Sequence, residues 1–191
     1  PVYEYTIGQA IADGYLAACD IRKGRVDLDD TGLTLEEIMA HEPRDARTGR
    51  VLTTAEVREQ YEARQFEDQI LLPDRVLAMT RDLFRYLVET GGPEQKTIVF
   101  CVRDHHADEV AIALNNLYAA YCAEHGLERK EAYAFKCMAS HGKDELANLR
   151  GSRTSHYIAT TVDLLSTGVD VPSLQNVVFF RYLKSPILFY Q

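Results

Sequence analysis

The chain has 191 residues, of which 46% are hydrophobic and 26% charged, the composition of an ordinary globular protein with room for one good-sized domain. Its formal net charge is −8, and residues 1–90 carry most of the excess, with 11 basic against 18 acidic residues. This balance excludes a dedicated basic nucleic-acid-binding module, whose positive charge would supply most of the affinity for phosphates.

The first part of the chain, residues 1–92, is predicted to be mostly helical, with polar connections. A threonine followed three residues later by glutamate is the capping-box pattern of a helix N-terminus, and it occurs twice here. The elements expected in chain order are a short helix ending at Gly14, two short strands about Lys23-Gly24, a short helix capped by Thr34 with Glu37, a polar loop over residues 41–52, a longer helix from Thr53 with Glu56 to about Gln69, and a helix opened by Pro73 and closed by Gly91-Gly92. An apolar stripe from Val76 to Leu87 indicates that the last helix packs against a core.

From residue 93 the pattern changes to short apolar runs that alternate with helical segments. The runs of strand length are Thr97–Val102, Tyr133–Met138, His156–Thr161 and Asn176–Tyr182. Helical patterns follow from Asp104, which can cap its helix, to about Gly126, around Leu146, and again after Ser185-Pro186. Strands that alternate with helices predict parallel pairing through crossover helices. We therefore predict an α/β domain from about residue 93, preceded by the more helical part.

The residues that could bind a ligand are concentrated in the stretch Ile158–Pro172. In an open parallel sheet, ligands bind beyond the carboxyl ends of the strands, where Thr160 and Thr161 stand. Hydroxyls there can hold a phosphate oxygen. Gly168 would let a backbone approach a ligand closely, and Asp170 could accept from a ribose hydroxyl or orient an arginine. The alternative interpretation, in which these residues only form a turn and bind no ligand, fits the pattern equally well.

Other candidate residues favour structural roles. Adjacent His105 and His106 point in different directions on a helix, and no third ligand stands at good spacing, so we expect no metal site and interpret both as solvated residues. Cys101 lies inside an apolar strand and is expected to be a buried thiol. The acidic segment Glu62–Asp68 is interpreted as a solvated face or a contact surface, and the tyrosines of residues 118–133 as packing against the sheet.

Targeting and redox signals are absent from the sequence. Four scattered cysteines form no CxxC pair, which argues against a disulfide framework and for a reducing cytosol. No apolar run approaches the ~20 residues that cross a bilayer, so no membrane partner is expected. The chain opens on Pro1 without a signal pattern or an initiating Met, as an internal piece of a longer chain would.

The stretch Ile158–Pro172 resembles motif V of superfamily 2 helicases, in which Ala-Thr is followed by a spacer and a Gly-x-Asp-x-Pro ending. The run Thr97–Val102, preceded by Lys96, is similar to motif IV, the first strand of the second RecA-like lobe. The segment Ala139–Gly142 stands where this family has a backbone-binding loop. The long spacer resembles the repair-helicase and restriction-enzyme branches, and together with residues 176–191 it resembles the motor (restriction) subunit of type I restriction-modification enzymes.

The resemblance implies part of an ATP-dependent DNA translocase. Residues 93–191 would be the RecA-like helicase C-terminal lobe, truncated before motif VI, and residues 1–92 its linker and helical insertion part. The implied DNA-backbone contacts are Thr160, Thr161, Arg103, Ser140, His141 and Gly142, and the implied ATP-cleft residues are Gly168 and Asp170. The implied partners are double-stranded DNA and the modification and specificity subunits, in a bacterial or archaeal cytoplasm.

The sequence contains no GxxxxGK[ST] phosphate loop and no acidic magnesium box. ATP and Mg²⁺ would therefore be bound mainly by the first lobe, and we expect no catalytic residue in this chain and no activity from the chain alone. Other superfamily 2 motors, of the repair or type III restriction kind, remain open as alternatives, as does a non-catalytic docking domain. A small-molecule enzyme would need a Gly-rich fingerprint after the first strand, and Val102–Asp108 supplies none.

Overall fold

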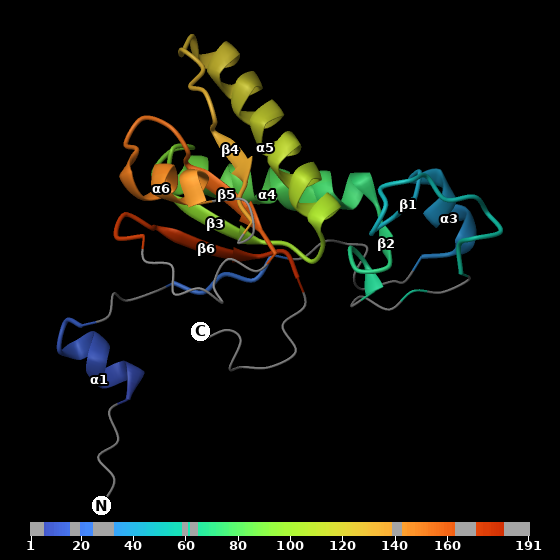
Figure 1. The fold of residues 1–191 in the computed structure, drawn as a ribbon, viewed down its shortest axis with the longest axis horizontal. Helices are drawn as coiled ribbons and strands as arrows, with labels where there is room; N and C mark the ends of the chain where they lie inside the picture. The colour runs from blue at the N-terminus through green and yellow to red at the C-terminus, as the bar shows by residue number, and fades with distance from the viewer. Residues whose placement is uncertain are drawn as a thin grey trace, which may run out of the picture.

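The computed structural model describes residues 6–15, 20–24, 33–58, 61, 65–138, 143–162 and 171–181. Within these residues the chain is an α/β protein, as predicted, with a four-stranded parallel sheet between helices (Figure 1). Short helices and an antiparallel strand pair precede the sheet in the chain. No helix among the described residues is long and apolar enough to cross a membrane.

The sheet has the strand order β4-β5-β3-β6, and every neighbouring pair is parallel. Its strands are β3 (Thr97–Phe100), β4 (Ala134–Lys136), β5 (Ile158–Thr161) and β6 (Asn176–Phe179). Each lies inside a predicted run, so all four strand predictions are confirmed. Phe100 stands in register with Thr161 and Phe179, so the segments that follow these strands meet at one edge of the sheet. We call this the carboxyl edge.

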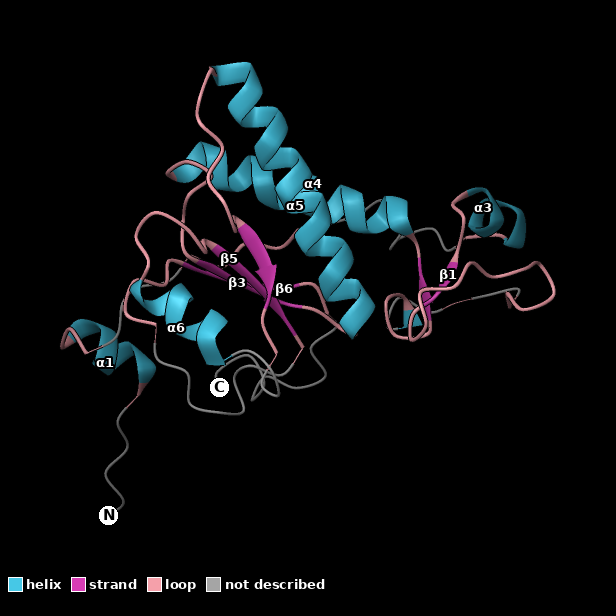
Figure 2. Ribbon diagram, turned by 45° about the horizontal axis from the view of Figure 1, so that its top comes forward, coloured by secondary structure: helices cyan, strands magenta, loops and turns pink. Residues whose placement is uncertain are grey.

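Helices cover both faces of the sheet, because side chains along a strand point alternately to each face. The helices are α4 (Pro73–Thr90), α5 (Asp104–His125) and α6 (Lys143–Gly151). Figure 2 shows α4 and α5 together on one face and α6 on the other. Val99 and Cys101 pack into the core under α4 and α5, whereas Ile98 and Phe100 pack with Leu149 of α6.

The ends of the helices follow the predicted signals. Gly126 ends α5 in the left-handed conformation, with φ of 64°, and Gly91 ends α4. Asp104 was expected to cap α5, but it is the first helical residue, and the N-cap Arg103 makes no side-chain cap. The Asp104 carboxylate instead accepts a hydrogen bond from Lys136 on β4, at 2.9 Å.

The tyrosines pack against the sheet, as predicted. The rings of Tyr118 and Tyr133 stack with centroids 3.9 Å apart, and both side chains are buried. The Tyr133 hydroxyl donates to the carbonyl of Pro93 at 2.7 Å, and that of Tyr118 to Glu94 at 2.9 Å. This core also contains Leu87 of α4, so it extends across the residue 92/93 boundary; the boundary itself stays a prediction.

Described residues 33–72 form what we call the N-terminal unit. Its elements are α3 (Leu35–Ala40), β1 (Arg44–Asp45) and β2 (Ile70–Leu71), and the two strands pair antiparallel. The predicted capping box of Thr34 and Glu37 is present at α3. A small apolar core holds the unit together, made of Ile38, Leu52, Val57, Phe66, Ile70 and Leu72. The predicted first helix is also present, as α1 (Ile7–Ala12), apart from the sheet in Figure 1.

The helix predicted from Thr53 to Gln69 was wrong over its described residues. The Glu56 carboxylate accepts from the Thr53 amide at 2.9 Å, which is one of the two contacts of a capping box, but only a turn follows. Arg50 also holds that carboxylate at 2.6 Å, and Val57 turns into the apolar core of the unit. Tertiary contacts therefore override a correct local signal. No strand is present at residues 20–24, and the rest of the strand pair predicted there lies outside the described residues.

Candidate functional site

A cavity of about 290 Å³ opens at the carboxyl edge of the sheet. Its described lining comes from the ends of three strands and from the N-terminal unit: Val102, Arg103 and Asp104 after β3, Met138 after β4, Val162 after β5, and Ala46 and Arg47. Open parallel sheets bind ligands at this edge. The edge of the sheet at which a ligand site was predicted therefore contains a cavity, and two arginines line it.

Arg103, a predicted DNA-backbone contact, lines this cavity and is about one-third exposed. Its Nη2 lies 2.5 Å from the Asp68 carboxylate, and its Nε donates to the Asp68 carbonyl at 3.3 Å. Asp68 thus fixes the guanidinium at the mouth of the cavity. The DNA contact of Arg103 stays a prediction, and a phosphate would have to share this guanidinium with Asp68.

Two further cations stand at the ends of strands, and the sequence reasoning missed both. Lys136 ends β4 and donates to Asp104 at 2.9 Å and to Asp108 at 2.8 Å. Burial lowers the pKa of Lys136, but its bonds to these carboxylates outweigh that effect, so the pKa lies above its usual value. Arg181, after β6, donates to the Val162 carbonyl at 3.2 Å. A basic residue near the end of a predicted strand run was the available signal for both.

The two predicted threonines lie on opposite faces of β5, and both side chains are fully buried. The Thr160 hydroxyl donates to the Ala107 carbonyl in the first turns of α5, at 2.9 Å. The Thr161 hydroxyl has no hydrogen-bond partner in the part of the chain that the structure describes. Neither hydroxyl reaches the surface in this structure, and their contact with DNA stays a prediction.

Opposite stability effects are expected when each threonine is replaced by valine, which keeps the shape and the β-branching. Thr160→Val removes a buried hydrogen bond and should lower the free energy of unfolding by about 1 kcal/mol. Thr161→Val removes a buried hydroxyl for which the described residues provide no partner, and it should leave the free energy unchanged or raise it by about 1 kcal/mol. Urea unfolding of the two variants measures the difference; equal shifts would contradict the assigned surroundings.

The remaining predicted site residues lie outside the described residues. These are Ser140, His141, Gly142, Gly168 and Asp170. Their roles at the DNA backbone and in the ATP cleft stay predictions.

The interpretation of the histidine pair as solvated was wrong for His106, which is fully buried. Its Nδ1 accepts from the Val102 amide at 3.3 Å, and its ring stacks on Phe180. Burial lowers the pKa of His106 to about 3, so the ring is neutral. His105 is half-buried beneath Gly49 of the N-terminal unit. Within the described ranges, no three His, Cys, Asp or Glu side chains form a group that could hold a metal ion.

Of the two interpretations of the acidic segment, the contact surface is the one that holds at Glu67, whose side chain is buried. Glu67 and Arg75 form an ion pair at 2.5 Å, inside the contact between the N-terminal unit and α4. Related ion pairs join the unit to α4 and to the start of α5: His41–Asp74, Arg44–Glu109 and Asp68–Arg103. Glu67 and Asp68 of the acidic segment therefore contact α4 and the start of α5.

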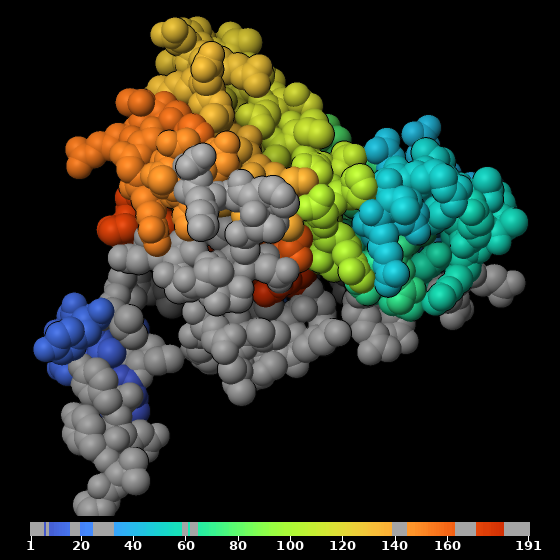
Figure 3. All heavy atoms as spheres, in the orientation of Figure 1, coloured from blue at the N-terminus to red at the C-terminus, as the bar shows by residue number. Residues whose placement is uncertain are grey.

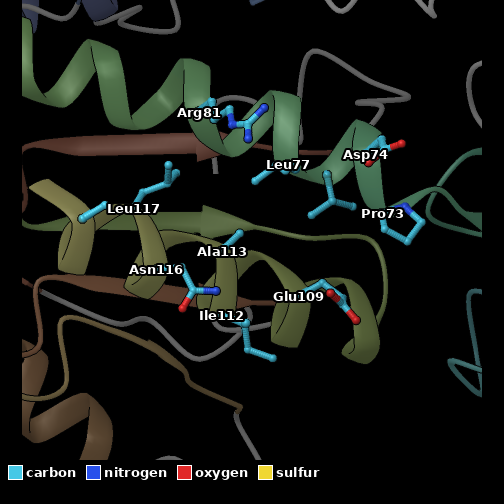
Figure 4. A pocket seen from close by; sticks show the side chains of 11 residues that line it. Pro73, Asp74, Leu77, Arg81, Glu109, Ile112, Ala113, Asn116 and Leu117 are labelled. Carbon is cyan, nitrogen blue, oxygen red and sulfur yellow. The ribbon is translucent and has the colours of Figure 1, made fainter. Parts of the chain in front are cut away.

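A second hollow, of about 360 Å³, lies between α4 and α5 (Figure 4). Leu77, Ile112 and Leu117 give it a largely apolar lining. Its two carboxylates, Asp74 and Glu109, are already in ion pairs with the N-terminal unit. The carboxyl edge is therefore the better candidate for ligand chemistry.

No protein-family model matches the chain, but comparison with known proteins finds two relatives of the same kind. The endonuclease subunit of the type I restriction enzyme EcoKI of Escherichia coli is 33% identical over 206 aligned residues, covering 100% of this chain and 16% of that protein. The EcoAI endonuclease subunit of the same species is 28% identical, covering 100% of this chain and 22% of that protein. The chain thus spans less than a quarter of either relative.

Two further similarities are partial. The ATP-dependent RNA helicase DBP10 of Yarrowia lipolytica is 32% identical over 97 residues, covering 50% of this chain and 9% of that protein. The Hef helicase domain of Pyrococcus furiosus is 18% identical, covers 62% of this chain and 21% of that one, and has a TM-score of 0.38, too low to define the fold. The two similarities that span the whole of this chain confirm the resemblance. The chain is homologous over its whole length to a segment of the endonuclease subunits of type I restriction enzymes.

Proposed function

We propose that this chain is the second RecA-like lobe of an ATP-dependent DNA translocase in a type I restriction endonuclease subunit. The observation that carries this proposal is the cavity at the carboxyl edge, next to the strand end that resembles motif V. Its arginines can contact phosphates of double-stranded DNA, and such contacts hold the duplex without reading its sequence. The few cations fit an overall acidic chain that supplies only part of the DNA affinity.

ATP and Mg²⁺ are assigned to the first lobe of the proposed motor. The described residues offer no group of carboxylates for Mg²⁺, and the sequence has no phosphate loop. Gly168 and Asp170 are proposed to approach the nucleotide when the lobes close. The residues of this chain would then hold and release the DNA backbone as closure alternates with opening. Modification and specificity subunits are the proposed partners, in the cytoplasm.

A second superfamily 2 motor, such as another helicase, is the alternative that a specific observation favours. The similarity to an RNA helicase over 97 residues marks features that are not restricted to restriction enzymes. ATP-dependent displacement of a DNA triplex by the full-length protein, together with DNA cleavage, supports the restriction motor. Unwinding without cleavage supports the alternative.

The test of the proposed site compares Arg103→Ala with Asp68→Ala in the full-length subunit. Both substitutions break the same ion pair, whose side chains are each about one-third exposed and which is worth no more than about 1 kcal/mol. Only Arg103→Ala removes a cation from the cavity, so it should weaken duplex binding about tenfold, the loss expected for one hydrogen bond to a charged group. Asp68→Ala should bind at least as well as wild type. Fluorescence anisotropy without nucleotide measures the binding, and triplex displacement measures translocation.

The thermal midpoint of each variant is the control for folding. Equal losses of DNA binding in both variants would show that the ion pair has a structural role only. Unchanged binding in Arg103→Ala would remove the carboxyl edge as a DNA site.

A further inference from the structure

A tight turn in residues 44–51 places an arginine at the cavity, and we call it the Arg47 turn. The Asp45 carboxylate accepts from the amides of Arg47 and Thr48, at 3.0 Å and 2.8 Å, and from the Thr48 hydroxyl. The Gly49 amide donates to the Asp45 carbonyl at 2.8 Å, and Gly49 has a left-handed φ of 70°. The conformation of the turn is therefore fixed by its own hydrogen bonds.

The Arg47 turn packs against the first turns of α5. A Cβ at Gly49 would lie 3.1 Å from the His105 ring, so the backbone of the turn touches that ring closely. Arg44 Nη1 donates to the Glu109 carboxylate at 3.0 Å. In Figure 3 the N-terminal unit adjoins the beginning of α5. Arg47 is thus presented from a firmly held position.

The charge of the cavity is positive because of Arg47. Among its described lining residues, the charged ones are Arg47, Arg103 and Asp104, a net charge of +1. Arg103 is bonded to Asp68 and Asp104 to Lys136, whereas the exposed guanidinium of Arg47 has no partner in the residues that the structure describes. One uncompensated positive charge matches the single charge of a phosphodiester better than it matches a triphosphate.

We propose that Arg47 binds a phosphate of the DNA backbone at the mouth of this cavity, beside Arg103. The inference rests on the proposed function as a DNA translocase lobe, and it adds to that lobe a contact from the N-terminal unit. The apolar remainder of the described lining, which is Ala46, Val102, Met138 and Val162, offers no side-chain hydrogen bonds for reading bases. The contact is therefore independent of DNA sequence.

The test uses the full-length subunit and a short DNA duplex without nucleotide. Arg47→Ala should weaken binding about tenfold, the low end for a hydrogen bond to a charged group. The loss should be equal for unrelated sequences, and the slope of log affinity against log salt should fall by about one. Arg47→Lys should retain most of the affinity. The matched control is Arg129→Ala, an exposed arginine beyond the other end of α5, about 30 Å away by helix length.

A second measurement identifies the source of the phosphate. Modification of arginines by phenylglyoxal, followed by mass spectrometry, should show Arg47 protected by duplex, with Arg129 unprotected. A non-hydrolysable ATP analogue without DNA should give no protection. Protection by the analogue alone, or wild-type affinity in Arg47→Ala, would overturn the inference and leave the proposed function in place. Failure of the wild-type subunit to bind any duplex would overturn both.

Discussion

Lowering the pH from about 6.5 to 5 is expected to reduce the free energy of unfolding by about 2 kcal/mol through His106 alone. Burial and then the nearby charge of Arg75 lower the pKa of His106 to about 3 in the folded chain. In the unfolded chain it titrates near 6.5. Between these values the unfolded chain binds one more proton, so protonation favours unfolding. This contribution to stability is complete above about pH 6.5 and is lost as the pH falls toward 3.

The variant that isolates this effect is His106→Phe, which keeps a ring against Phe180 and removes the titrating group. Its stability at neutral pH will differ, because the Val102 amide loses an acceptor. The slope of stability against pH should nevertheless be flatter than in wild type. Urea unfolding at a series of pH values gives these slopes; identical slopes in His106→Phe and wild type would contradict the prediction.

Loss of one partner of the buried Glu67–Arg75 ion pair is expected to destabilise the fold by about 3–5 kcal/mol. Arg75→Met keeps an unbranched side chain beside the ring of Phe66, over which the guanidinium now lies at 5.2 Å. It removes the Arg75 cation from the buried Glu67 carboxylate, and the loss of this charge pairing is the cause of the destabilisation.

The double variant Glu67→Gln/Arg75→Met separates charge from packing. With both charges removed, most of the lost stability should return, so the two substitutions will be far from additive. Urea unfolding of both single variants and the double variant completes the cycle. Additive losses would show that packing, rather than the loss of this charge pairing, dominates at this contact.

The sheet and its main helices were predictable because their signals are local. The run Thr97–Val102 is apolar at consecutive positions, as required of a strand buried on both faces, and β3 lies within it. Gly126 stops α5 because it adopts a left-handed conformation at little steric expense. Parallel pairing followed from the alternation of strands and helices, and it placed Thr160 at the carboxyl edge correctly.

The features that sequence reasoning missed depend on partners far along the chain. His106 is buried because Phe180 covers it, and Glu67 because Arg75 and the N-terminal unit enclose it; no neighbour in sequence signals either. A position at the end of β5 did not reveal that the Thr160 hydroxyl faces α5. The tight turn could have been predicted from Asp45 and the residues that follow it. Its packing against α5 could not, because that packing depends on tertiary contacts.

Only Leu72 separates β2 of the N-terminal unit from α4, since β2 ends at Leu71 and α4 begins at Pro73. Leu72 between them is fully buried, and proline fixes its own φ. A hinge needs residues that can absorb a large change in φ and ψ, and this joint provides none. The N-terminal unit is therefore rigidly connected to α4. Any rotation of the sheet therefore moves the Arg47 turn with it, through an arc set by the distance of the turn from the rotation axis.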